Sequence, residues 1–159
     1  MFATDDGAEP FTTFADNLDD FTWAALDAAL RAVLAPRGLD LVRTEWLKPL
    51  GTGLHEFRVR HDAAEIEQMF GGVDADEAAN AISPPRAILL RVFVHFYGDK
   101  VVLLLSGYDK AKDPSAKRQE RDITQARKYL TAWNEQQKRR QKAAGRGRAG
   151  GDSTRRSRH

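Results

Sequence analysis

Arginine residues on short, otherwise apolar segments are the side chains of this sequence best suited to chemistry. Arg58 and Arg60 alternate in GLHEFRVR (53–60), and Arg91 is the only arginine or lysine in AILLRVFVHFY (87–97). If the two segments are neighbouring strands, these guanidinium groups converge on one face of a sheet. Converging cations bind a phosphodiester and stabilise the added charge of a pentacoordinate phosphorane. The pattern fits metal-free ribonuclease chemistry or, without cleavage, plain binding of RNA or DNA; solvated strand cations are the simpler alternative.

Lysines stand close to the ends of these segments. Lys48 opens KPLGTG (48–53), which has the composition of a loop, and Lys110 and Lys112 follow the apolar run VVLLLSGY (101–108). A lysine whose pKa is lowered by its surroundings can remove the proton of a 2′-hydroxyl group. We therefore count Lys48 and Lys110 with the three arginines as candidate catalytic residues.

Other catalytic signatures do not occur in the sequence. There is no GxSxG, P-loop, GxGxxG or HExxH motif. There is also no cysteine, which excludes disulfides, thiolate metal sites and a cysteine nucleophile. The histidines lack metal-ligand spacing, and most are interpreted as ordinary strand or tail residues; His55 is kept as an RNA-contact candidate because it is close to the arginine pair. We expect no metal and no small-molecule cofactor.

Charge is distributed unevenly along the chain. Residues 1–107 contain 9 Lys and Arg against 17 Asp and Glu, whereas residues 108–159 contain 16 against 6. A basic C-terminal third favours a polyanionic partner, with nucleic acid as the first candidate. The RNA contacts expected from this part of the chain are Lys112, Lys117, Arg118, Arg139 and Arg140.

The length and the apolar content bound the class of protein. A chain of 159 residues with 42% hydrophobic residues supports one ordinary domain. No stretch approaches the roughly 20 apolar residues of a membrane span. The acidic N-terminus lacks the basic and then apolar order of a signal peptide. We expect a cytoplasmic protein with no membrane partner.

Hydrophobic spacing predicts the elements that position these residues. An amphipathic helix is expected from a cap at Asp20 or Thr22 to about Ala35, and residues 39–47 are either extended or a short helix. Strands are expected at 54–60, 87–97 and 101–108, the last two joined by a Gly-Asp hairpin turn. A long helix then follows, with Asp113 as its cap and Pro114 as its first residue.

Composition divides the chain into parts. We expect a flexible acidic N-terminus at 1–18, a folded domain at 19–142 and a disordered Gly/Ser-rich basic tail at 143–159. An acidic insertion at 61–86 interrupts the strands and includes a short helix around Ala63–Phe70. It is either a passive surface insertion or a lid that brings its carboxylates near the strand arginines. These carboxylates are Asp62, Glu65, Glu67, Asp74, Asp76 and Glu77.

The order of these parts resembles a known family. WLKPLGTGLHEFRVR, followed by LLRVFVHFYGDKVVLLLSGYDKAKDPSAKRQERDITQARKYL, is similar to the RelE/HigB superfamily of toxins. The phage-derived branch of that superfamily typically reads K-P-L-G-x-G-L-Y-E-L-R, R-V-F-Y-F, V-L-L-x-G-F-x-K-K-x-x-x-T-P and then A-x-x-R-x-x-Y. The resemblance covers about residues 20–135, apart from the insertion at 61–86.

The resemblance implies a fold and an activity. The fold is α+β, a small antiparallel sheet of about four strands flanked by helices, related to microbial ribonucleases. The activity is cleavage of mRNA in the ribosomal A site, through attack of the 2′-hydroxyl group and formation of a 2′,3′-cyclic phosphate. The implied partners are the ribosome, mRNA and a cognate antitoxin, often a helix-turn-helix protein, which holds the toxin inactive.

The resemblance also implies roles for individual residues. Lys48 matches a position that carries a catalytic histidine or lysine, and Arg58 and Arg60 match positions that hold the scissile phosphate. Arg91 matches the arginine assigned to transition-state charge. Lys110 and Lys112 match the basic pair after the last strand.

Three departures from the family pattern leave other functions open. His55 replaces a usual tyrosine, the insertion at 61–86 is additional, and the tail after Lys138 exceeds the usual length. The alternative to a toxin is a non-catalytic phage or prophage protein that binds a host protein or nucleic acid through the same basic face. A regulatory partner that binds operator DNA ranks last, because the sequence offers no recognition helix.

Overall fold

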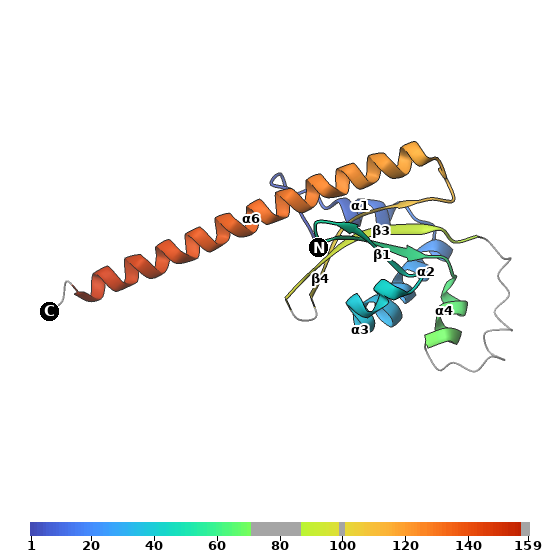
Figure 1. Ribbon diagram of the computed structural model, residues 1–159, viewed down its shortest axis with the longest axis horizontal. Coiled ribbons are helices and arrows are strands. Elements are labelled where there is room, and N and C mark those ends of the chain that lie inside the picture. Colours follow the sequence, from blue (N-terminus) through green and yellow to red (C-terminus); the bar gives the residue numbers. More distant parts are fainter. Residues whose placement is uncertain (71–86, 99–100, 157–159) are drawn as a thin grey trace.

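Four strands form one antiparallel sheet, which helices cover on both faces (Figure 1). The computed structural model describes residues 1–70, 87–98 and 101–156, with side chains as far as residue 145. The strands lie in the order β1-β2-β3-β4, and this confirms the predicted α+β class with about four antiparallel strands. Their bounds are β1 Leu47–Gly51, β2 Leu54–Val59, β3 Leu90–Tyr97 and β4 Val101–Asp109.

Strand β1 occupies most of the segment that was predicted to be a loop. Lys48 pairs with Glu56 and Pro49 pairs with His55, so this segment forms an edge strand of the sheet. An edge position tolerates Pro49 because the missing N–H group can face away from the ladder. The β1–β2 turn has positive φ at Gly51, Thr52 and Gly53. A Cβ atom at Gly53 would lie 3.0 Å from the His95 ring, so the turn needs a glycine there.

Helices α1, α2 and α4 cover one face of the sheet, which we call the apolar face. Phe57, Val59, Val92 and Val94 of the sheet pack there against Leu26, Ala29 and Val33. The bounds on this side are α1 Pro10–Asp16, α2 Asp20–Ala29, the π-helical η1 Leu30–Leu34, α3 Ala35–Arg37, the 3-10 helix η2 Gly38–Arg43 and α4 Ala63–Phe70.

The helix predicted between about residues 20 and 35 is confirmed, with a different cap. The carboxylate of Asp19 accepts a hydrogen bond of 2.8 Å from the Thr22 amide, and this makes Asp19 the N-cap. Residues 39–47, for which the sequence left two alternatives, contain most of η2 and the start of β1.

The N-terminal segment, predicted to be flexible, is folded against the domain. The Phe2 side chain is only 1% exposed, and the Phe2 amide donates a hydrogen bond of 3.0 Å to the carbonyl of Leu104 on β4. Phe11 of α1 is buried in the apolar face. The phenylalanines explain the difference, because they give an otherwise acidic segment enough apolar area to pack.

Helix α6, Ala116–Arg156, covers the opposite face, which we call the α6 face (Figure 1). Ala126 and Leu130 pack there on Leu54, Phe93 and Leu105. The helix runs past the sheet and extends to Arg156, although the tail from residue 143 was predicted to be disordered. A helix that is already nucleated extends without a second nucleation cost, which accounts for the difference.

Helix α4 confirms the short helix predicted at Ala63–Phe70, and residues 71–86 lie outside the described part of the chain. Ile66 of α4 is buried in the apolar face. The helix therefore lies on the side of the sheet opposite Arg58 and Arg91, and of the two alternatives for the insertion, the positions of Glu65 and Glu67 favour the passive one over the lid. Asp74, Asp76 and Glu77 fall outside the described residues.

No helix among the described residues has both the length and the apolar character needed to cross a membrane.

Candidate functional site

Glu56 is a carboxylate buried between the sheet and α6. It lies opposite Phe93 in the register and is fully buried. Its Oε1 atom is 2.9 Å from Nε of Arg58 and 3.6 Å from Nε of Arg91. Its Oε2 atom accepts a hydrogen bond of 3.4 Å from the Gln119 side chain of α6. One buried carboxylate therefore holds two guanidinium groups on the α6 face.

Arg58 and Arg91 stand directly opposite each other on β2 and β3. Like charges in this position destabilise a sheet, and Glu56 offsets the repulsion. Burial lowers the pKa of Arg91, Glu56 raises it, and Arg58 and Arg60 lower it further. The Arg91 side chain is 3% exposed, whereas that of Arg58 keeps 21%. Arg58 is therefore the member of the pair that a phosphate can reach.

Tyr108 of β4 continues this polar layer beside Arg91, its partner in the register. Its ring stacks on Phe93, with centroids 6.1 Å apart, and its hydroxyl group has no hydrogen-bond partner among the described residues. Burial, with a contribution from Glu56, raises the pKa of Tyr108 to about 12. The phenol consequently stays protonated and offers a hydrogen-bond donor inside the layer.

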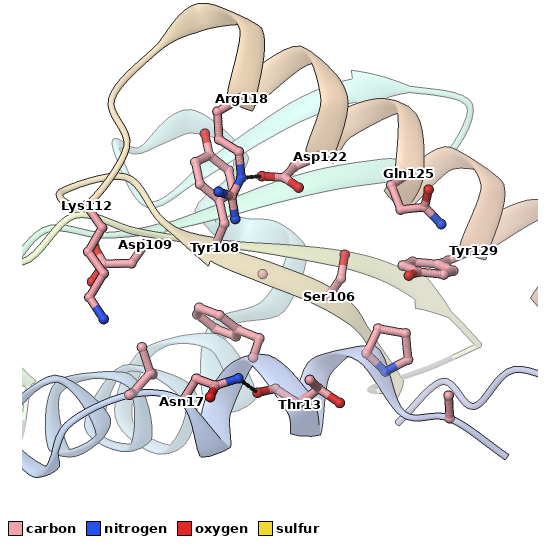
Figure 2. Close-up of a pocket in the computed structure, with 15 residues that line it drawn as sticks. Thr13, Asn17, Ser106, Tyr108, Asp109, Lys112, Arg118, Asp122, Gln125 and Tyr129 are labelled. Atoms are coloured by element: carbon pink, nitrogen blue, oxygen red, sulfur yellow. Dashed lines mark hydrogen bonds and ion pairs between the residues drawn. The ribbon is translucent and has the colours of Figure 1, made fainter.

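A groove of about 480 Å³ opens between α1, β4 and the start of α6 (Figure 2). Ser106, Gly107 and Tyr108 of β4 line it, together with Phe14 of α1. The guanidinium carbon of Arg118 lies 5.7 Å from the centroid of the Tyr108 ring. The groove thus places an exposed guanidinium group above an aromatic ring, next to the buried layer.

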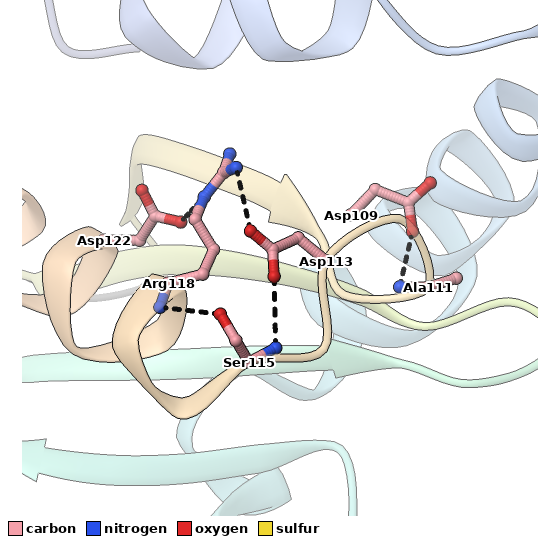
Figure 3. A network of polar contacts seen from close by, with 6 residues as sticks. All are labelled: Asp109, Ala111, Asp113, Ser115, Arg118 and Asp122. Carbon is pink, nitrogen blue, oxygen red and sulfur yellow. Dashed lines mark hydrogen bonds and ion pairs between the residues drawn. The ribbon is translucent and has the colours of Figure 1, made fainter.

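Two aspartates and Ser115 fix Arg118 at the start of α6 (Figure 3). Nε of Arg118 is 2.6 Å from Asp122, and Nη1 is 3.9 Å from Asp113. The hydrogen bond to Asp122 raises the pKa of Arg118. The Ser115 hydroxyl group accepts a hydrogen bond of 3.2 Å from the Arg118 amide, so Ser115 caps α6 instead of the predicted Asp113. These carboxylates hold the side chain in place and partly offset its positive charge.

The structure brings several of the candidate residues to the α6 face. Lys48 is exposed on β1 opposite Glu56, and Arg60 is exposed just after β2. Lys112 lines the groove with Arg118. Lys110 follows β4 and is partly exposed, with its amide hydrogen-bonded to the Leu89 carbonyl at 2.8 Å, and Lys117 is exposed in the first turn of α6.

The remaining candidates lie elsewhere. His55 points to the apolar face, where its ring packs edge-on against Phe96 at 5.2 Å, and burial lowers its pKa. Arg139 lies near the other end of the sheet and forms an ion pair of 3.1 Å with Asp5. Arg140 is exposed beside it on α6. None of these three joins the layer around Glu56.

Sequence reasoning missed Glu56, Tyr108, Gln119 and Asp122. A signal for Glu56 was present, because residues two apart on a strand share a face, and this places Glu56 beside Arg58. The other three depend on the packing of α6 across the sheet, which the sequence alone does not specify.

Comparison of the chain with protein-family models, with curated proteins and with solved structures gave no match. Within the part of the chain that the structure describes, no group of three or more His, Asp or Glu residues is arranged to hold a metal ion. Arg58 and Arg118 can bind phosphate oxygens, and Arg91, Glu56 and Tyr108 can hold them in position.

Proposed function

We propose that this protein binds RNA on its α6 face and cleaves it, as a ribosome-dependent endoribonuclease toxin of a toxin–antitoxin pair. The observation that carries the proposal is Arg58, a partly exposed guanidinium group held by a buried carboxylate, with Arg118 on the neighbouring groove. The resemblance to RelE/HigB toxins supplies the reaction and the partners: mRNA on the ribosome, and a cognate antitoxin. Such a protein acts in the cytoplasm.

The proposed reaction assigns a task to each accessible side chain. The 2′-hydroxyl group gives its proton to a base and its oxygen attacks the adjacent phosphorus; the bond to the 5′-oxygen breaks, that oxygen takes a proton from water, and a 2′,3′-cyclic phosphate forms. Arg58 stabilises the added charge of the phosphorane with the nitrogens that Glu56 leaves free. Lys48 lies on the same face of the sheet, and its neutral amine is the proposed base.

Arg91 takes a different role from the one that its sequence position implied. The side chain is 3% exposed, so it does not reach a substrate bound to this surface. It is a positioning residue that shares Glu56 with Arg58 and fixes the carboxylate between the two strands. Tyr108, equally buried, supports the same layer.

A second candidate function is RNA binding without cleavage. It is favoured by the burial of Arg91 and by Glu56, which offsets one of the two positive charges of the arginine pair. In that case Arg58, Arg60 and Arg118 contact phosphates, and no bond breaks.

The test is induced expression of the chain without a partner, with growth and primer extension on cellular transcripts as readouts. We expect growth arrest and new transcript ends, and we expect Arg58→Gln to reduce the cleavage rate by about 10²–10³. Arg43→Gln is the matched control, because Arg43 is exposed at the end of η2, away from the α6 face.

Three outcomes separate the candidates. RNA binding without new transcript ends supports the second function and contradicts the toxin. Cleavage that persists unchanged in Arg58→Gln contradicts the assigned site. Growth arrest that is relieved by a small helix-turn-helix protein, encoded by the gene next to the one for this protein, supports the toxin–antitoxin pair.

A further inference from the structure

A second aromatic site lies where β3 turns into β4, under the middle of α6. Tyr97 and Trp133 are in contact, with ring centroids 4.7 Å apart at 50°. His95 packs against Trp133 at 5.4 Å, and its Nδ1 atom is hydrogen-bonded to the Gly53 carbonyl at 2.8 Å. The cluster is thus fixed from three elements, yet Tyr97 remains 41% exposed.

A groove of about 430 Å³ opens beside these rings. Tyr97 and Trp133 form its aromatic side, and α6 supplies the rest of the lining. At about 100° per residue, the helical lining residues fall on one stripe of α6. They carry side-chain amides and one ammonium group, which can donate to and accept from the edge of a planar polar molecule. These residues are Asn134, Gln137, Lys138 and Gln141.

The helix is strongly cationic beside this groove and toward its C-terminal end. Arg140 and Lys142 are exposed, and the Lys138 ammonium group lies 4.0 Å from the Glu135 carboxylate. Residues 143–159 contain five further arginines and one aspartate. An aromatic surface with an adjacent row of cations matches a base and its flanking phosphates, because every base offers a π-face and each nucleotide carries a charge.

We propose that the Tyr97–Trp133 groove stacks an unpaired base of a single-stranded nucleic acid, while the cations of α6 contact the phosphates on either side. Tyr97 and Trp133 provide the ring faces, and Asn134 and Gln137 face the edge of the base. The site is separate from the layer around Glu56. It does not depend on cleavage, and it holds equally for a catalytic and a non-catalytic protein.

The test uses the fluorescence of Trp133 in the full chain, titrated with a short oligouridylate. We expect the oligonucleotide to quench tryptophan emission in the parent and not in Trp133→Phe. Tyr97→Ala is expected to weaken binding about 5- to 150-fold, the range for loss of one base–aromatic stack, whereas Tyr97→Phe keeps the ring and most of the affinity. Trp23→Phe is the control, since Trp23 is 42% exposed on α2 of the apolar face.

Titrations with DNA and with duplex RNA show whether binding depends on base stacking, on the 2′-hydroxyl group or on charge alone. A deoxyribonucleotide of equal length that binds equally well indicates stacking without recognition of the 2′-hydroxyl; weaker binding indicates RNA. Duplex RNA that binds as tightly as the single strand overturns the proposal, because attraction to the helix charges then suffices. Unchanged affinity of the Tyr97→Ala variant for the single strand also overturns the proposal. Arg58→Gln should keep the Trp133 quenching, which separates a failure here from a failure at the proposed cleavage site.

Discussion

The two faces of the sheet are both well buried, but they differ in what they bury. Phe57 and Glu56 are neighbours on β2, each is fully buried, and they point to opposite faces. The apolar face surrounds Phe57 with aliphatic and aromatic side chains, and the α6 face surrounds Glu56 with Arg58 and Arg91. A buried ion cluster of this kind is often no more stabilising than apolar packing. Apolar residues could therefore replace the whole ion cluster of the α6 face without loss of stability. This is the side on which we place function.

The largest effect is expected from removing the carboxylate that holds the α6 face together. Glu56→Ala leaves Arg91 buried without its partner and should lower the free energy of unfolding by about 3–5 kcal/mol in urea denaturation. The double variant Glu56→Gln, Arg91→Met should recover most of that loss, because the uncompensated charge is gone. Asp27→Ala, which breaks an exposed ion pair on α2, serves as the control and should match the parent. A Glu56→Ala protein as stable as the parent would contradict this account of the layer.

On the apolar side, α1 approaches the sheet closely at Gly107. A Cβ atom there would lie 2.6 Å from Cε1 of Phe14 and 2.9 Å from the Arg91 carbonyl oxygen. Gly107→Ala should therefore lower the free energy of unfolding by about 1–3 kcal/mol, as overpacking does. Gly145→Ala, where the Cβ atom meets open space in α6, should not lower it. Equal stability of the two variants would show that α1 does not rest on β4 in this way.

A smaller effect concerns pH, and it should come from the apolar face. Burial lowers the pKa of His61, but hydrogen bonds to Glu65 and Glu45 outweigh it and raise the pKa. The folded state then binds more protons than the unfolded state, whose histidine pKa is about 6.5. The stabilisation by protonated His61 is fully present below about pH 6.5 and is lost as the pH rises through the folded-state pKa of His61.

His55 has the opposite sign, since burial lowers its pKa; its contribution is present above about pH 6.5 and lost as the pH falls. Urea denaturation between about pH 5 and 8 should show that stability falls as the pH rises above about 6.5. His61→Gln should remove that fall. RNA binding through the arginines should change little over the same range, because arginine stays charged. A fall in stability that survives in His61→Gln would point to another group.

The smallest effect on stability is expected at the end of α6. Deleting residues 143–159 removes the last part of α6, which extends past the sheet as far as Arg156, so the thermal midpoint should stay close to that of the parent (Figure 1). Binding of single-stranded RNA should weaken and depend less on salt. The slope of the logarithm of the binding constant against the logarithm of the salt concentration should decrease in magnitude by about 0.7 for each phosphate contact removed. A midpoint that drops by about ten degrees, several kcal/mol for a domain of this size, would make the segment structural.

The sequence predicted the elements that depend on local patterns. Alternation identified β2, the β-branched and aromatic composition on either side of a Gly-Asp turn identified β3 and β4, and helical spacing identified α2 and α6. It did not identify β1, because Pro49 and its neighbouring glycines have the composition of a loop, and only pairing with β2 makes them a strand. The fold of the N-terminus was missed for a similar reason, since Phe2 finds its partners about a hundred residues later.

For the candidate site, charge on an apolar strand identified residues that meet in the structure, whereas closeness to them in the sequence did not. Arg58 and Arg91 were selected because cations are unusual among apolar strand residues, and they do face each other. His55 was selected for its closeness to Arg58, yet an odd spacing on a strand sends the two side chains to opposite faces. The burial of Arg91 could not be predicted, because it depends on how α6 crosses the sheet.

The anchoring of Phe2 sets an order of events during synthesis. Its amide bonds to Leu104, and the next residues are held by α6, where Gln136 donates to the Ala3 carbonyl at 2.9 Å and Arg139 pairs with Asp5. At about 5–20 residues per second, a ribosome needs roughly 5–20 s after Phe2 to reach Leu104. During that time the buried phenylalanine of the finished protein is an exposed apolar residue on a nascent chain. These residues leave the ribosome before their partners and are thus among the last to reach their native positions.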